Sequence, residues 1–316
     1  MRHIFIVNNV AGGGKKTVRL IPQIESYFAV NGGKYAIVKT ECAGDATRIA
    51  KEYAQTGEQI RIYACGGDGT LHEVVNGVAG YKNAEVGVFP CGTGNDYVSS
   101  YGKAEAFMDV KAQVEGSAVE VDLMLTEGIY SINQCSMGFD AAVADNVRIF
   151  KAKPMISGSM AYILSVLYTV LGKLGNRLRI IIDDEHIIEG EYLFAISAKG
   201  KYHGGGMMSA PQANPKSRML NFVLVKKVTK PFLLRLIPKY IKGEHLAVTE
   251  VVTSTFGKKM RVIADRPLPV TLDGEIIVSE EITTEIVEKG INFVLPSTIT
   301  VKAEKPARVP AKATKA

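Results

Sequence analysis

Residues 65–77, with the sequence CGGDGTLHEVVNG, combine three glycines with a carboxylate and form the first candidate for chemistry. Glycine lets the backbone turn sharply and approach a ligand closely, because no Cβ blocks the way. A helical pattern begins at Thr70, with Glu73 at the spacing of a capping box, and free amides at a helix N-terminus after a glycine turn bind anions. Asp68 would repel a bare polyphosphate unless a divalent cation lay between them. The segment therefore predicts a magnesium nucleotide site, and a strand-to-helix turn without a ligand is the alternative.

A second glycine loop, FPCGTGNDY, occupies residues 89–97 and also follows a predicted strand. Taken alone, it could be a turn with an Asn or Asp cap. Loops after successive strands of a parallel sheet open at the same edge, so the two loops can face one crevice. A third loop, NNVAGGGKK at residues 8–16, contains Lys15 and Lys16, which can offset phosphate charge.

These loops do not match the two common nucleotide-binding fingerprints. Asn9 stands where a P-loop needs glycine, five residues before Gly14. A dinucleotide fingerprint would need glycine at position 72 or 97, where the sequence has His72 and Tyr97. The spacing therefore disfavours both of these folds.

The elements that must position the loops fall into two groups. Strand patterns at 3–7, 35–39, 60–65 and 85–89 alternate with helical patterns at 18–29, 45–55 and 70–79, which predicts a parallel sheet with βαβ units. After a strand at 119–125, short alternating strands are expected at 177–182, 192–197, 221–225, 247–252, 259–264, 268–272, 284–287 and 291–295, with helices at about 158–174 and 231–242. This second pattern predicts an antiparallel sandwich or barrel. We expect an α/β domain over residues 1–124 and a β-rich domain over residues 125–300.

The composition excludes several classes of protein. Of 316 residues, 47% are hydrophobic and 22% charged, and the four cysteines form no CxxC pair, which favours a cytoplasmic globular protein over a zinc or disulfide scaffold. The net charge is +6, and most of it comes from residues 301–316, which we expect to form a disordered basic tail. The rest of the chain therefore gives no indication of nucleic-acid binding. The apolar segment 155–171 is short for a membrane span, so we expect a buried amphipathic helix.

In this order the motifs resemble the diacylglycerol kinase catalytic domain family, in its bacterial lipid kinase branch. Relatives of that family include sphingosine and ceramide kinases and, more distantly, NAD kinases and phosphofructokinases. The resemblance covers about residues 1–296 and rests on NxxAGGGK at the start, Thr40, GGDGTLHEVVNG, PCGTGND, NQCSMGFDA (133–141) and GGGMMSAPQA (204–213). It implies a three-layer parallel-sheet nucleotide domain like that of NAD kinases and phosphofructokinases, a β-sandwich lipid domain after it, and ATP in the cleft between them.

The resemblance also implies which residues bind the nucleotide. They are Asn8, Asn9, Val10, Ala11, Gly12, Thr40, Gly66, Gly67, Asp68, Gly69, Thr70, Leu71, His72, Thr93, Asn95 and Asp96. Within this set it implies that the catalytic magnesium is held by Asp68, with Asp96 beside it.

The segment DGE at residues 273–275 has two interpretations. Asp-Gly between two predicted strands is typical of a hairpin turn, and spacing alone favours that interpretation. The resemblance implies instead that the segment closes over the cleft, with Glu275 accepting the proton of the lipid hydroxyl. Asp273 would be a supporting carboxylate or the alternative base. The chemistry demands little more of the protein, because phosphoryl transfer depends mainly on positioning and charge stabilisation.

The sequence departs from the family at residues 214–221, NPKSRMLN. Bacterial members have acidic residues there that hold a structural magnesium, whereas this chain has Ser217 and Arg218 in place of Asp-Gly and Asn221 in place of Asp. Arginine beside a cation site is adverse in charge and bulk. The sequence therefore argues against a structural magnesium near Asn214, Ser217 and Met219.

Residues 231–245 have apolar positions at helical spacing, with Arg235, Lys239 and Lys242 on the other face. A basic amphipathic helix can lie on an anionic membrane, and a surface helix that covers the sandwich is the alternative.

Together, the sequence predicts an ATP- and magnesium-dependent lipid kinase that phosphorylates the hydroxyl of diacylglycerol or a related lipid. We expect it to be peripheral at the inner face of the membrane. One alternative is a soluble-substrate kinase of the NAD kinase-like superfamily. The other is a non-catalytic nucleotide- or lipid-binding protein, which the altered segment 214–221 suggests.

Overall fold

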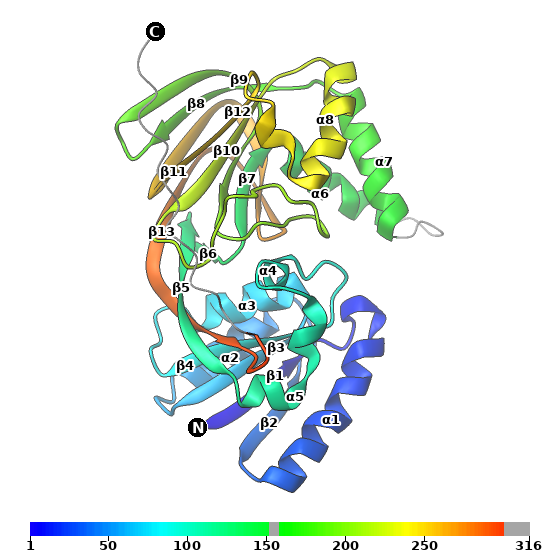
Figure 1. The fold of residues 1–316 in the computed structure, drawn as a ribbon, viewed down its shortest axis with the longest axis vertical. Helices are drawn as coiled ribbons and strands as arrows, with labels where there is room; N and C mark the ends of the chain where they lie inside the picture. The colour runs from blue at the N-terminus through cyan, green and yellow to red at the C-terminus, as the bar shows by residue number, and fades with distance from the viewer. Residues whose placement is uncertain (152–157, 300–316) are drawn as a thin grey trace. The chain divides into compact units, whose positions relative to one another are not determined.

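The computed structural model describes residues 1–151 and 158–299, which fold into two compact units (Figure 1). Of the described residues, the first unit contains 1–123, 130–132 and 287–299, and the second contains 124–129 and 133–286. The expected basic tail, 301–316, lies outside the described residues, as do residues 155–157 of the apolar segment.

The first unit is built on a parallel sheet in the order β2-β1-β3-β4. Its elements alternate as the sequence predicts: β1 (Arg2–Val7), α1 (Lys15–Asn31), β2 (Lys34–Lys39), α2 (Asp45–Ala54), β3 (Ile60–Gly66), α3 (Asp68–Val78) and β4 (Ala84–Pro90). Short helices η1 (Ala11–Gly13), α4 (Asp96–Ser99), η2 (Ala104–Met108) and α5 (Val110–Val114) lie between or after them. The prediction of an α/β nucleotide-domain fold is confirmed.

Alternation of buried side chains along these strands produces three layers. In β1, Ile4 and Ile6 belong to the core that α2 and α3 cover, whereas Phe5 and Val7 belong to the core that α1 covers. Because successive side chains of a strand point to opposite faces, each strand contributes to both cores. The sheet is thus buried on both sides, as parallel sheets generally are.

The chain does not cross between the units at a single point near residue 124. Strand β5 (Ser117–Thr126) and β6 (Ile129–Ser131) lie at the first crossing, and β13 (Glu275–Leu295) returns to the first unit at Val287. Phe293 pairs in parallel with Val86 of β4, and its ring contacts those of Tyr97 and Tyr101. The predicted domain 125–300 therefore differs from the structure, because the last strand completes the core of the first unit.

The second unit is an antiparallel β structure, in agreement with the expected sandwich or barrel. Its strands are β7 (Gln134–Gly138), β8 (Asn176–Ile182), β9 (His186–Ala198), β10 (Leu220–Lys226), β11 (Val252–Gly257), β12 (Lys259–Leu272) and the first half of β13. Strands β7 and β8 each pair with both β9 and β12, so the long strands connect two stretches of sheet.

Three strand predictions in this unit need correction. Residues 247–251 form no strand: they follow η3 (His245–Ala247) in turns, where Val248 and Val251 pack against the core beneath α8. The patterns at 259–264 and 268–272 belong to one strand, β12, which is interrupted by an irregularity between Ile263 and Leu268. Likewise, 284–287 and 291–295 are parts of β13.

Three helices accompany the strands of the second unit: α6 (Phe139–Lys151), α7 (Gly158–Leu171) and α8 (Lys230–Lys242) (Figure 1). Val170 of α7 and Leu233 and Leu236 of α8 share a core with β9 and β10. Helix α7 buries one side, as expected of the amphipathic helix predicted there, but its other side exposes apolar residues: Leu167, Tyr168 and Leu171 are 48%, 61% and 75% exposed. Within the described part of the chain, every helix is too short or too polar to cross a membrane.

Candidate active site

The three glycine loops follow β1, β3 and β4 and touch one another through their backbones. A Cβ placed on Gly12 would lie 2.2 Å from the carbonyl oxygen of Cys91, and a Cβ on Gly92 would lie 2.4 Å from the Cα of Gly67. Backbone hydrogen bonds reinforce this contact, because the amides of Cys91 and Gly92 donate to the carbonyl of Gly66. The loops therefore form one structure, as their positions in the sequence predict.

The glycines of these loops serve two different purposes. Gly12, Gly66, Gly67 and Gly92 are required by neighbouring protein atoms; for Gly66 the neighbour is the Thr70 hydroxyl, which would lie 2.1 Å from a Cβ. Gly69 has no atom within 4 Å of its Cβ position, although it lies in the first turn of α3. Packing therefore does not explain a glycine at position 69, and close approach of a ligand remains the prediction made from the sequence.

The loop 8–16 is joined to the loop 65–70 by Asn8. Its Nδ2 donates to the Thr70 hydroxyl at 3.2 Å, and its Oδ1 accepts from the amide of Val10 at 3.2 Å. Asn9 and Val10 are exposed and Ala11 is half-buried. Thr40 lies just after β2, where its amide donates to the carbonyl of Val7 at the end of β1. The structure thus brings the loop 8–12 next to 66–70 and anchors Thr40 at the same edge of the sheet.

The carboxylates of Asp68 and Asp96 approach each other across Gly94. A Cβ on Gly94 would lie 2.9 Å from Oδ2 of Asp68 and 3.4 Å from Oδ2 of Asp96. Burial, and next the charge of Asp96, raise the pKa of Asp68 to about 7, although the amides of Asn95, Asp96 and Tyr97 act in the opposite direction. Two carboxylates placed this close oppose each other's ionisation, which a bound cation would relieve.

These two residues fit a divalent cation. They supply the oxygen ligands that magnesium prefers, on loops whose glycines leave the backbone accessible. Magnesium binding by Asp68 and Asp96 stays a prediction, and the structure shows only that the two carboxylates lie on either side of Gly94.

Other predicted residues contribute to the site's architecture. Asn95 adopts a left-handed conformation with φ of 55°, and its side chain bonds both the amide and the carbonyl of Gly92, so it shapes the loop. Leu71 and His72 are buried, at 2% and 6% exposure, in α3. Thr93 is exposed in the loop 89–97.

The predicted capping box is wrong. Helix α3 begins at Asp68 rather than Thr70, and no side chain caps its first turn. Glu73 instead accepts a hydrogen bond from the amide of Ala46, at the start of α2. The spacing matched a capping box by chance, because Glu73 is needed by the neighbouring helix.

Of the two lysines in the loop 8–16, Lys16 contacts the end of β4. Its ammonium donates to the carbonyl of Pro90 at 3.4 Å, at the end of β4, while Lys15 is exposed. To bind a phosphate at these loops, the side chain of Lys15 or Lys16 would have to change its conformation.

DGE lies in the second unit and forms the turn between β12 and β13. Asp273 and Gly274 both have positive φ, 52° and 104°, and Leu272 pairs with Glu275, as in a two-residue hairpin. Oδ1 of Asp273 accepts from the amides of Asn133 and Gln134 at 3.0 and 2.8 Å. Asp273 therefore fastens the hairpin to the start of β7.

Glu275 has a different environment. It is exposed, and among the described residues no donor lies within hydrogen-bond distance of its carboxylate. The structure confirms the turn at Asp273-Gly274 that spacing alone favoured. The role that the resemblance implied for Glu275 stays a prediction.

Two buried polar residues of the second unit escaped the sequence analysis. Asp140, at the start of α6, accepts from the Ser136 hydroxyl at 2.6 Å, and burial raises its pKa. Lys199 is fully buried just after β9. Asp140 lies within the motif 133–141, but no side-chain role was assigned to it, and only the tertiary structure shows that these charges are internal.

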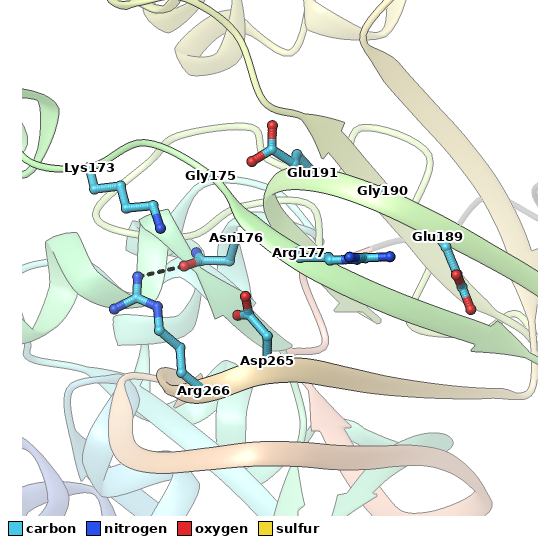
Figure 2. Close-up of a pocket in the computed structure, with 9 residues that line it drawn as sticks. All are labelled: Lys173, Gly175, Asn176, Arg177, Glu189, Gly190, Glu191, Asp265 and Arg266. Carbon is cyan, nitrogen blue, oxygen red and sulfur yellow. Dashed lines mark hydrogen bonds between the residues drawn. The ribbon is translucent and has the colours of Figure 1, made fainter.

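A cavity of about 510 Å³ in the second unit contains none of the predicted site residues. Figure 2 shows the residues that line it coming from the segment before β8, from β8 itself, from β9 and from β12, with Arg266 donating to Asn176 at 2.7 Å. Its walls carry equal numbers of acidic and basic residues: Glu189, Glu191 and Asp265 against Lys173, Arg177 and Arg266. This balance offers no net attraction for a polyphosphate.

Comparison with known proteins agrees with this geometry. The model of the diacylglycerol kinase catalytic domain matches residues 2–126, and that of the YegS C-terminal NAD kinase beta sandwich-like domain matches residues 133–301. A diacylglycerol kinase of Bacillus subtilis is 28% identical over 278 residues, which cover 87% of this chain and 90% of the relative. A diacylglycerol kinase of Staphylococcus carnosus is 27% identical, over 85% and 87% of the two chains.

Solved structures show the same fold. A candidate diacylglycerol kinase from Bacillus anthracis superposes with a TM-score of 0.75 at 21% identity, over 95% of this chain and 98% of that one. Yeast NADH kinase in complex with NADH gives a TM-score of 0.52 at 12% identity, over 93% and 83% of the two chains. Both the α/β part and the β-rich part are therefore found together in proteins of known structure.

The two purposes of the glycines can be separated by substitution. We predict that Gly69→Ala leaves the free energy of unfolding unchanged or raises it by up to about 1 kcal/mol, because alanine favours the helix. The same change should weaken ATP binding by about tenfold or more, since one lost contact of about 1.4 kcal/mol has that effect. Calorimetric ATP titration and urea unfolding measure both.

Gly92→Ala is the matched comparison and should destabilise the protein by about 1–3 kcal/mol, because its Cβ would meet backbone. Unchanged ATP affinity in a stable Gly69→Ala protein would contradict the ligand-approach interpretation.

The raised pKa of Asp68 gives a pH-dependent prediction. The folded protein holds this proton more tightly than the unfolded chain, so the wild type loses stability as pH rises from about 4 to about 7. Asp68→Asn removes that loss and should stabilise the nucleotide-free protein by on the order of 1–3 kcal/mol at pH 8, and by less at pH 5. Urea unfolding in EDTA at both pH values measures the difference.

Asp45→Asn is the control with the opposite sign. A backbone hydrogen bond from Glu41, and next the side chain of Arg48, lower the pKa of Asp45, so this variant should be less stable than wild type at neutral pH. An Asp68→Asn protein no more stable than wild type at pH 8 would show that the two carboxylates do not strain each other.

Proposed function

Because the chain belongs to the diacylglycerol kinase family of bacterial lipid kinases, we propose that its acceptor is the hydroxyl group of diacylglycerol or a closely related lipid. The chain is a lipid kinase, and ATP use follows from the kinase family. The observation that carries the proposal is the pair Asp68 and Asp96 on contacting glycine loops, which fits a magnesium polyphosphate. The choice of lipid is supported by the names of relatives such as the Bacillus subtilis protein.

We propose that the phosphates of ATP lie against the loops 8–12, 66–70 and 92–96. Gly69 leaves room for close approach, and the backbone amides of the first turn of α3 face outward as donors. Magnesium, when bound by Asp68 and Asp96, neutralises charge on the phosphates. Asn8 and Asn95 hold the loops in shape through the hydrogen bonds described above.

We assign the general base to Glu275. Its carboxylate accepts the proton of the lipid hydroxyl as the hydroxyl oxygen forms a bond to the γ-phosphorus and the bond to the bridging oxygen of ADP breaks. Availability supports Glu275, whereas Asp273 already accepts from two backbone amides. Asp273 is then a positioning residue that holds the hairpin.

Two variants test this assignment. Glu275→Gln should lower turnover by about 100-fold or more, because a positioned base contributes that much, while ATP affinity and thermal stability stay unchanged. Asp273→Asn keeps an acceptor oxygen for the two amides and should retain most of its turnover. The measurement is transfer of labelled γ-phosphate into mixed micelles of diacylglycerol, long-chain bases, ceramide or undecaprenol.

NAD and fructose 6-phosphate serve as soluble acceptors in the same assay. Label in a soluble acceptor alone would replace the lipid proposal, and ATP binding without any labelled product would indicate a protein that has lost catalysis. Loss of turnover in Asp273→Asn but not in Glu275→Gln would move the base to Asp273.

We further propose that the protein meets the membrane through the α7–α8 surface, defined as the exposed apolar residues Leu167, Tyr168, Leu171, Phe232, Leu234 and Ile241. The two helices meet where the ammonium of Lys230 donates to the carbonyl of Leu171 at 2.6 Å. Both cover the same core of the second unit. Large exposed apolar groups on adjacent helices favour contact with an apolar phase.

Charge supports an anionic bilayer as the partner. Residues 192–243 contain ten lysines and arginines and no aspartate or glutamate. Arg235, Lys239 and Lys242 lie on α8 itself and are exposed. Each basic residue near an anionic membrane contributes about 1 kcal/mol of attraction. Apolar contact and basic charge together are the combination that interfacial helices use.

Leu171→Glu tests this surface, because it places a negative charge where an acyl-chain contact is proposed. Binding to vesicles rich in phosphatidylglycerol should fall by about tenfold, which corresponds to about 1.4 kcal/mol. Val278→Glu is the matched control, since Val278 is 68% exposed on β13 and outside the two helices. Co-sedimentation in low and high salt measures both, and equal losses in the two variants would contradict the assignment.

A further inference from the structure

Lys199 is a charged residue in the interior of the second unit. It follows β9 directly, and its side chain is fully buried. Its own amide and that of Gly200 donate to the carbonyl of Asn133, at 2.9 and 3.0 Å, which fixes the backbone beside β7. A buried ammonium is costly unless acceptors replace the water that it loses.

The acceptors are main-chain carbonyls of the loop that leads into β10. The ammonium of Lys199 donates to the carbonyl oxygen of Ser217 and lies 3.5 Å from that of Met219. The Ser217 hydroxyl lies 2.8 Å from the Met219 oxygen and 3.0 Å from the carbonyl of Asn214. The loop thus turns two carbonyl oxygens, those of Ser217 and Met219, toward the ammonium.

Convergent carbonyl oxygens around a charge are the arrangement that a bound cation also requires. This is the segment in which the resemblance implied a structural magnesium near Asn214, Ser217 and Met219. The residues present do not fit that metal, because residues 192–243 contain no carboxylate. Within the described residues, no cluster of three acidic, histidine or cysteine side chains suits a metal. A divalent ion would also be repelled by the ammonium.

We infer that the Lys199 ammonium is the resident cation of the 214–219 loop and replaces a structural metal ion there. The loop is then ordered by a charge that is part of the chain. The fold of the second unit requires no divalent cation, and the magnesium requirement of the protein comes from the nucleotide site alone.

Backbone hydrogen bonds connect residue 199 to the DGE hairpin. Asn133 accepts from the Lys199 amide through its carbonyl and donates through its own amide to Asp273. The backbone at residue 199 is therefore two hydrogen bonds away from the turn that precedes Glu275.

The first experiment uses the full chain and needs no assay of activity. Thermal unfolding without nucleotide should give the same midpoint, within about 1 °C, in EDTA and in millimolar Mg²⁺ or Ca²⁺ once the nucleotide site is disabled by Asp68→Asn. Mn²⁺ titration of Asp68→Asn, followed by electron paramagnetic resonance, should show no site tighter than about 0.1 mM, a threshold typical of weak extracellular calcium modules. One tightly bound Mn²⁺ per chain, or loss of stability in EDTA, would overturn the inference.

The second experiment changes the charge at nearly constant shape. Lys199→Met should lower the unfolding midpoint by about 4 °C or more, because the loop carbonyls lose their buried partner. Lys226→Met is the matched control on β10, where the lysine is exposed, and should shift the midpoint by less than about 1 °C. Equal midpoints for the two variants would overturn the inference, and if Lys199→Met does not fold, the cation measurements on Asp68→Asn still decide it.

Discussion

Close contact between backbones, Gly12 against Cys91 and Gly67 against Gly92, is the constraint on which the nucleotide site depends. Parallel pairing of β1, β3 and β4 brings the three loops to one edge of the sheet, but pairing alone leaves room for each loop to vary. Contact at distances that exclude any Cβ removes that freedom, because a side chain at these positions would force the loops apart. Helix α3 and the short α4 then begin at fixed places, and Asp68 and Asp96 begin with them.

An electrostatic cost follows from this geometry. The fold holds two carboxylates on either side of Gly94, where burial and mutual repulsion raise the pKa of Asp68. Amides at the start of α4 offset only part of the effect. The hydrophobic cores on the two faces of the sheet must therefore stabilise an arrangement that its own charges oppose. A site of this kind is adapted to its ligand rather than to the stability of the empty protein, which is common where binding requires like charges to meet.

Most of what the sequence predicted depends on local pattern, and most of what it missed depends on distant contacts. Alternation of strands and helices through residue 90 was sufficient for the first sheet, and the glycine loops followed because parallel strands end together. The sequence could not predict that residues 287–295 return to the first unit, because the strand pattern around Phe293 would suit a strand of either unit. Its contacts with Tyr97 and Tyr101, which are distant in the sequence, place it in the first. Glu73 matched a capping box, yet its partner is Ala46 on another helix. At 247–251 the sequence pattern suited a strand, but Val248 and Val251 lie in turns and pack against the core beneath α8.

The two units contain buried charges of opposite sign: the carboxylates of Asp68 and Asp96 in the first unit and the ammonium of Lys199 in the second. In the first, Asp68 and Asp96 lie on either side of Gly94, and under the function proposed above their charge is balanced by a cation that arrives with the nucleotide and leaves with it. In the second, the carbonyl oxygens of Ser217 and Met219 lie beside the ammonium of Lys199, which is part of the chain itself. An exchangeable cation suits a nucleotide that must be bound and released in each catalytic cycle. A lysine ammonium suits the 214–219 loop, which must stay ordered during the whole cycle. Loss of the acidic residues at 217 and 221 is consistent with this division, because a carboxylate ligand has no role where lysine already supplies the charge.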